Sequence, residues 1–269
     1  MVISRKLILL TIFFLNPVFA NQTFNWDGVF IGGFLGYSWN NSNATTLIGA
    51  VGSNPQYFSS IQNINSVAQS GTGKITNNFF LGGGLIEANK SWDNLIYSIL
   101  LDIRSYNNKK TQEVSNSYPT FPASYLVSTS VQTNWLFTAR GRVGYLNDIF
   151  NYNMIFPYFT TGVALTNYKV ANAFSDNAVS LGVSTGNLDY PRNLKHNKTG
   201  WTVGTGFAMH LTKKLTLNAE YLYVNFSSGK ANNSIVCSAN SCQNYINSFV
   251  TTANLNSNIF QIGLNLKVY

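Results

Sequence analysis

Residues 198–226 read KTGWTVGTGFAMHL, then TKK, then LTLNAEYLYVNF, so two runs flank a short polar turn. In both runs the alternate residues are mostly apolar, and most of these are large: Trp201, Val203, Phe207, Met209 and Leu211, then Leu215, Leu217, Ala219, Tyr221 and Tyr223. Because successive side chains of a strand point to opposite faces, the pattern predicts a hairpin with one apolar and one polar face. Each run is about ten residues long, which is what a tilted strand needs to cross a bilayer. We interpret the stretch as one hairpin of a transmembrane β-barrel.

The composition agrees with this interpretation. Charged residues make up 10% of the 269 residues and aromatic residues 14%, yet the mean hydropathy is only +0.01. Alternating strands explain these values, because half of their residues face lipid and half face polar groups. The formal net charge is +8, or +6 if Arg5 and Lys6 are removed with a leader. The basic residues form no run, which argues against nucleic acid as a partner.

The N-terminus has the pattern of a secretory signal peptide. Arg5 and Lys6 precede the apolar run 7–15, and the segment ends in Val-Phe-Ala. We predict cleavage between Ala20 and Asn21. A membrane anchor is the alternative, but the apolar run is shorter than the roughly 20 residues that a spanning helix needs. The expected organisation is therefore a signal peptide at 1–20 and a barrel domain at 21–269.

The same alternation recurs along the chain and predicts eight strands, at 29–39, 79–87, 95–106, 133–145, 156–170, 198–211, 215–226 and 259–269. Three short turns alternate with four polar loops, which we place at about 40–77, 107–132, 171–197 and 227–253. Short turns at one end and long loops at the other are characteristic of outer-membrane barrels. The predicted fold class is all-β, an eight-stranded antiparallel up-and-down transmembrane barrel with long extracellular loops.

From residue 25 onwards the chain resembles a known family. The matching motifs are WDGVFIGG at 26–33, TARGRVGY at 138–145, PYFTTGVA at 157–164, and GWTVGTG at 200–206 followed by AEYLYV at 219–224. They are similar to those of small outer-membrane β-barrels of Gram-negative bacteria, described as porin-like surface antigens or hemin-binding proteins. Val268 and Tyr269 depart from the family's usual terminal Phe. The resemblance implies a location in the cell outer membrane.

Five charged residues fall on the inward parity of the predicted strands: Asp102, Arg104, Arg140, Arg142 and Glu220. An eight-stranded barrel is just wide enough for side chains to fill it, so we expect no open channel. We predict that these residues neutralise one another in an interior network. The alternative is a selectivity constriction, in which three arginines against two acids would favour anions.

The two histidines are His196, in a predicted loop, and His210, on an inward strand position. No sequence feature places either beside a carboxylate, so we expect no catalytic residues and no enzymatic activity. The family resemblance makes hemin a candidate ligand, which His196 or Tyr190 could bind; a merely solvated residue is the alternative. No cofactor is required by the sequence.

Cys237 and Cys242 both fall in the fourth predicted loop. Export to an oxidising compartment favours a disulfide between them. A metal site or a redox thiol pair is the alternative, but no further Cys or His lies nearby in the sequence, so we predict no metal.

Two functions follow as hypotheses. The first is a structural and surface-interaction role, carried by the extracellular loops of a monomeric barrel. The second is a hemin-binding or porin-like uptake role. The expected partners are outer-membrane lipid and the barrel-assembly machinery, with host surface molecules or hemin as further candidates.

Overall fold

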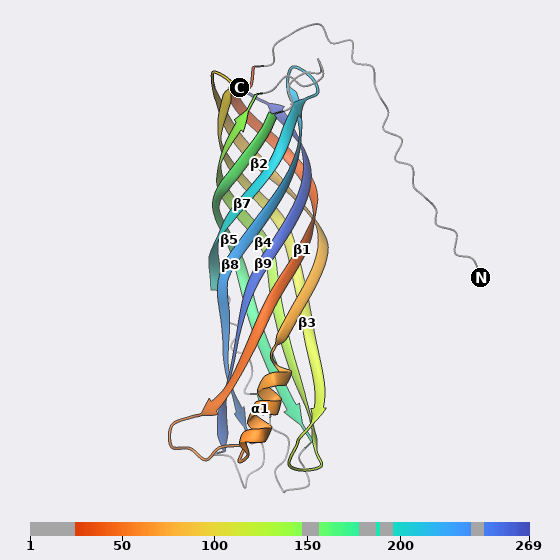
Figure 1. Cartoon of the computed structure of the whole chain (residues 1–269), viewed down its shortest axis with the longest axis vertical. Coiled ribbons are helices and arrows are strands. Elements are labelled where there is room, and N and C mark those ends of the chain that lie inside the picture. The colour runs from red at the N-terminus through yellow and green to blue at the C-terminus, as the bar shows by residue number, and fades with distance from the viewer. Residues whose placement is uncertain (1–24, 147–155, 178–186, 189–195, 238–244) are drawn as a thin grey trace, which may run out of the picture.

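The computed structural model describes residues 25–146, 156–177, 187–188, 196–237 and 245–269. Its elements, in chain order, are β1 (Gly28–Ala50), α1 (Ile61–Ser70), β2 (Gly73–Trp92), β3 (Leu95–Ser117), β4 (Ser124–Tyr145), β5 (Phe156–Asp176), β6 (Asn187–Leu188), β7 (His196–His210), β8 (Leu215–Val236) and β9 (Ile246–Lys267) (Figure 1). Among these residues no helix is long and apolar enough to cross a membrane.

Eight of the strands form a closed antiparallel ring. Each long strand pairs with the next one along the chain, with β7 following β5, and β9 returns to pair with β1. In this closing ladder Tyr37 lies opposite Phe260. The short strand β6 pairs with β8 beyond the end of the β7 ladder and also contacts β5. The predicted eight-stranded up-and-down barrel is therefore confirmed.

The outer surface of the barrel is apolar over the part nearest the short turns. Its exposed side chains include Ile31, Leu35, Ile99, Leu101, Ile103, Phe159, Val163, Trp201, Phe207, Tyr221, Phe260, Ile262 and Leu264. The alternate positions of the same strands point inward, where polar and charged side chains such as Thr138, Thr202 and Glu220 are buried. This is the inverse of a water-soluble sheet, and it fits a closed sheet whose outer solvent is lipid.

The strands are much longer than the sequence predicts. β1 and β3 each contain 23 residues, and β4, β8 and β9 each contain 22. The predicted loops at 107–132 and 227–253 are wrong over most of their length, because β3, β4, β8 and β9 continue through them. The predicted loop at 40–77 contains the end of β1, all of α1 and the start of β2.

The cause of this error is visible on β3. Its outward face carries Leu95, Tyr97, Ile99, Leu101 and Ile103, and then changes to Ser105, Asn107 and Lys109. A tilted strand crosses the bilayer in about ten residues, so the remainder projects beyond the hydrocarbon. There the outward face meets water, both faces become polar, and the period-two hydropathy signal disappears while the strand continues.

Helix α1 lies at the loop end of the barrel, opposite the C-terminus (Figure 1). Ser60 caps its N-terminus, because the Ser60 side chain accepts a hydrogen bond from the backbone N–H of Gln62 at 3.2 Å. The helix packs against β1, β3 and β4. Its buried residues are Asn63 and Val67. The polar composition of this segment hid the helix from the sequence analysis.

Replacing Ile99 by Lys places a charge on the lipid face of β3 and is expected to destabilise the barrel by about 2–4 kcal/mol. Ser115→Lys, on the exposed far end of the same strand, is the matched control and is expected to change stability by less than about 0.5 kcal/mol. Urea unfolding in lipid vesicles measures both values. Equal destabilisation by the two variants would contradict a lipid-facing Ile99.

Candidate functional site: the barrel interior

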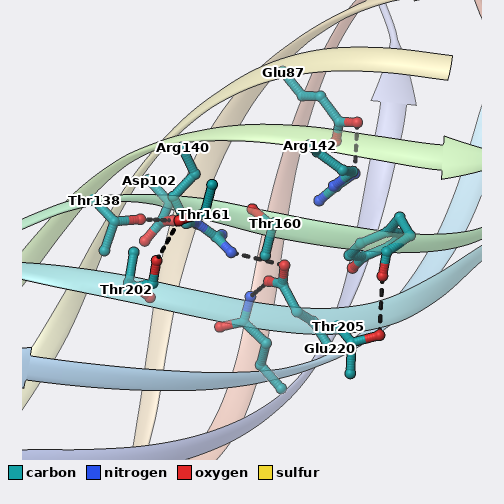
Figure 2. Close-up of polar contacts among 12 residues, drawn as sticks. Glu87, Asp102, Thr138, Arg140, Arg142, Thr160, Thr161, Thr202, Thr205 and Glu220 are labelled. Carbon is teal, nitrogen blue, oxygen red and sulfur yellow. Dashed lines mark hydrogen bonds and ion pairs between the residues drawn. The ribbon is translucent and has the colours of Figure 1, made fainter.

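Asp102 is the centre of an ionic layer inside the barrel. It lies on β3, and its side chain is fully buried. Oδ1 of Asp102 accepts hydrogen bonds from Nε and Nη2 of Arg104, two residues further along the same face of the strand. Oδ2 accepts hydrogen bonds from Nη2 of Arg140 at 2.9 Å and from the hydroxyl of Thr138 (Figure 2). Both carboxylate oxygens of Asp102 therefore accept hydrogen bonds from side chains inside the barrel.

Arg140, on β4, extends the network across the barrel. Its Nη1 donates a hydrogen bond to Oε1 of Glu220 on β8 at 2.7 Å (Figure 2). The other carboxylate oxygen, Oε2, accepts a hydrogen bond from Nε2 of Gln261 at 2.7 Å. Oε1 of Gln261 in turn accepts a hydrogen bond from Nη1 of Arg104 at 2.9 Å. These contacts link strands on opposite sides of the ring through side chains alone.

A second ion pair joins β2 and β4 nearer the short turns. Nη1 of Arg142 donates a hydrogen bond to Oε1 of Glu87 at 2.6 Å, and Oε2 of Glu87 accepts one from Nδ2 of Asn265 at 3.3 Å. The guanidinium of Arg142 also lies over the ring of Tyr158, 4.0 Å from its centre. Such a cation–π contact stabilises a buried guanidinium further.

Glu87 is a member of the site that the sequence analysis missed. It shares its inward parity with Leu81 and Leu85, while Phe80 and Ile86 on the opposite parity face outward. Apolar residues thus occupy both faces of β2, and no alternation marks Glu87 as an inward charge. The available signal was its parity with Leu85, two residues earlier on the same face.

The structure brings together all five charged residues that the sequence placed on the inward parity, and Glu87 completes their balance. Three arginines, Arg104, Arg140 and Arg142, face three carboxylates, Glu87, Asp102 and Glu220. The described interior layer therefore has no excess positive charge, which removes the basis for an anion-selective constriction. Buried charges need such pairing because removing an ion from water is costly.

Apolar side chains fill the barrel on both sides of the ionic layer. Towards the short turns a cluster consists of Trp26, Phe30, Ile96, Tyr158 and Ala208. Towards the loops a larger cluster includes Phe34, Leu81, Tyr106, Leu136, Tyr168, Leu222, Phe226 and Ile259. Arg104 joins the ionic layer to this cluster, because its guanidinium lies 4.9 Å from the ring centre of Phe34. The interior is therefore packed rather than open at these levels.

Aromatic residues and α1 close the loop end. The cluster there contains Phe58, Val67, Tyr118, Tyr125, Phe174 and Phe249. The carboxylate of Asp176 accepts hydrogen bonds from the hydroxyls of Tyr57 at 2.8 Å and Tyr118 at 2.5 Å. Burial, together with the Asp176 carboxylate, raises the pKa of Tyr118, so its hydroxyl stays protonated and available as a donor.

Helix α1 is fixed to this aromatic cluster by hydrogen bonds from its own side chains. The hydroxyl of Tyr125 is hydrogen-bonded to Ser66 at 2.7 Å and to Ser70 at 3.0 Å. Nδ2 of Asn63 donates a hydrogen bond to the hydroxyl of Thr120 at 2.8 Å. The helix therefore sits in the mouth of the barrel as a cap that is bonded to β4 and to the turn before it.

His210 lies at the other end of the barrel. Its ring is partly buried, and its centre is 6.5 Å from that of Trp26 in an edge-on arrangement. Across the described ranges, no group of three or more His, Cys, Asp or Glu residues could hold a metal ion.

The remaining predicted site residues fall wholly or partly outside the described residues. The backbone of His196 lies opposite Tyr168 at the start of β7. Cys237 directly follows β8 and is buried. Tyr190, Cys242, Ala20 and Asn21 lie outside the described residues. Hemin binding, the disulfide and the cleavage site stay predictions.

Residues 50–267 match the sequence model of the outer membrane protein beta-barrel domain. The chain belongs to this family. A barrel of this family resides in the outer membrane, which explains the apolar outer face. The resemblance identified from the sequence motifs is confirmed.

Two curated relatives are similar over most of the chain. The 25 kDa outer-membrane immunogenic protein of Brucella abortus biovar 1 is 21% identical over 210 residues, which is 78% of this chain and 70% of the relative. The protein of the same name from Brucella canis is 22% identical over 211 residues, with the same two coverages. The solved structure of OprG from Pseudomonas aeruginosa is 14% identical, with a TM-score of 0.44 over 90% of this chain and 97% of that one.

Arg142→Leu is expected to destabilise the barrel by about 3–5 kcal/mol, because it leaves the Glu87 carboxylate buried without its cation. The double variant Glu87→Leu/Arg142→Leu removes both charges and is expected to recover much of this loss. Urea unfolding in lipid vesicles, followed by tryptophan fluorescence, measures the difference. A double variant no more stable than Arg142→Leu would contradict the ion-pair account.

Proposed function

We propose that the protein is a closed outer-membrane barrel with a structural and surface-interaction role, carried out by its extracellular part. The observation that carries the proposal is the interior packing. A neutral ionic layer with fully paired carboxylates separates two apolar clusters. A diffusion pore would instead need a continuous aqueous path, as in barrels with many more strands.

The cap at the loop end supports the same conclusion. A solute arriving from outside first meets α1 and the aromatic cluster, where Tyr118 and Asp176 are hydrogen-bonded to each other. An opening there would separate these contacts and expose the rings to water. The surface available to other molecules is then the outside of the projecting strands and the loops between them.

Two further observations support a surface role. The outward face of β3 beyond Ile103 is polar, so this half of the strand is built for exposure rather than for lipid. The Brucella relatives are named immunogenic proteins, and a projecting collar of strands and loops would be accessible to immune recognition in this chain too. Enzymatic activity is not part of this proposal.

Hemin binding is a separate proposal for the same end of the chain. It rests on His196, whose backbone begins β7 at the loop side of the barrel, and on Tyr190 in the preceding segment. It requires no passage through the barrel, so it is compatible with a closed interior.

In planar lipid bilayers, the purified protein is expected to give no steady single-channel conductance. A general porin inserted into the same bilayer is the positive control. A variant in which residues 57–71 are replaced by a Gly/Ser linker lacks the cap and is also expected not to conduct, because the ionic layer is retained. A stable channel in the unmodified protein would contradict the proposal.

A further inference from the structure

In the loop half of the barrel, β2 and β3 no longer share a hydrogen-bonded ladder. Their pairing begins at Trp92 opposite Leu95 and ends at Gly82 opposite Ser105. Beyond that point, within the described residues, β2 continues on β1 and β3 continues on β4. A bulge between Ser105 and Asn108 marks the point of separation. We call residues 73–81 of β2 and 106–117 of β3, taken together, the seam.

Side chains hold the two strands of the seam side by side. Nδ2 of Asn77 donates a hydrogen bond to Oδ1 of Asn108 at 2.8 Å. Further towards the loops, a Cβ added to Gly73 would lie 2.7 Å from Nε2 of Gln112, so these two residues are also close neighbours. The wall is therefore continuous there, but its facing backbone edges are not used in a ladder.

These two contacts bring two lysines together on the outward parity of their strands. Lys74 lies between Gly73 and Asn77 on β2, and Lys109 lies between Asn108 and Gln112 on β3, whereas Lys110 has the inward parity of Asn108. Strands that run antiparallel between two fixed contacts must place the intervening residues next to each other.

Both lysines are exposed and carry an uncompensated charge. In the described part of the chain no carboxylate forms an ion pair with Lys74 or Lys109. Glu113 is exposed on β3 just beyond them and is the one described carboxylate on this face of the two strands. The exposed amides of Asn78 and Asn107 supply additional hydrogen-bond donors.

An exposed apolar patch lies on the lipid-facing surface, next to the seam on the side of the short turns. Leu35, Phe80 and Ile103 come from the adjacent strands β1, β2 and β3 and are exposed by 75%, 86% and 58%. Lys74 and Lys109 lie roughly 20 Å along their strands from Phe80 and Ile103, at about 3.3 Å per residue. The site is thus apolar at the depth of acyl chains and cationic at the level of the headgroups.

We propose that the seam binds the phosphorylated headgroup of an outer-leaflet glycolipid, with its acyl chains against Leu35, Phe80 and Ile103. Lysine ammonium groups bind phosphates as point charges, and basic residues beside an anionic membrane surface each add to the attraction. Lipid binding at the seam does not depend on the proposed loop-mediated role, because a closed or an open barrel would present the same outer face.

The alternative is that these lysines only protect a free strand edge from pairing with other chains, or belong to a diffuse basic collar. Lys169 on β5 and Lys230 on β8 lie in the same half of the barrel, away from the seam. They make a matched comparison possible, because a diffuse collar would use them equally.

The test measures binding of fluorescently labelled bis-phosphorylated lipid A to the full protein in an uncharged detergent. The seam variant Lys74→Gln/Lys109→Gln is expected to bind at least about tenfold more weakly than the unmodified protein. The control variant Lys169→Gln/Lys230→Gln, with the same change in charge in the same half of the barrel, is expected to stay within about twofold. Thermal unfolding by circular dichroism verifies that both variants are folded.

Fully dephosphorylated lipid A provides the second arm of the experiment. The unmodified protein is expected to bind it at least about tenfold more weakly than the phosphorylated lipid, and the seam variant is expected to lose this preference. The proposal is overturned if both double variants lose affinity equally, if neither loses it, or if the two lipids bind equally well.

Discussion

The structure depends on one constraint: backbone N–H and C=O groups surrounded by hydrocarbon must pair with each other. The ring satisfies this because β9 returns to β1 and leaves no free edge at membrane depth. Closure then decides which side chains go where. The outer face meets lipid and becomes apolar, as at Ile99 and Phe159, while the inner face takes the polar residues.

The narrow interior that results sets a second condition. Eight strands enclose a space that side chains can fill, so the charges inside have no room for a hydration shell. They are arranged instead as paired groups, with Arg140 shared between Asp102 and Glu220, and Arg142 held by Glu87. Beyond the lipid, neither the pairing of all backbone groups nor the pairing of all charges is required, because water is present. The backbone ladder between β2 and β3 ends at the seam, where side chains such as Asn77 and Asn108 hold the two strands together.

The alternation in the sequence predicted the strand segments that cross the hydrocarbon, and it missed the segments that lie beyond it. Alternation from Leu95 to Ile103 identified β3, and the parity of Asp102 and Arg140 identified the inward charges. The signal ended where lipid ended, so the polar continuations of the strands were mistaken for loops. Glu87 was missed because its inward neighbours Leu81 and Leu85 belong to an apolar cluster. Where both faces of a strand are apolar, hydropathy does not alternate along the sequence and cannot show which residues point inward. The partners of each charge depend on register across the ring, which no local pattern contains.

The central claim, that the apolar face of a closed sheet lies against lipid, is tested most directly by fluorescence quenching from acyl chains. Two variants are compared, each retaining one tryptophan, either Trp201 on the outer face (51% exposed) or Trp26 inside the barrel (4% exposed), with the others replaced by phenylalanine. In vesicles of lipids brominated along their chains, strong quenching of Trp201 and weak quenching of Trp26 are predicted. Equal quenching of the two, or an unquenched Trp201, would contradict the account.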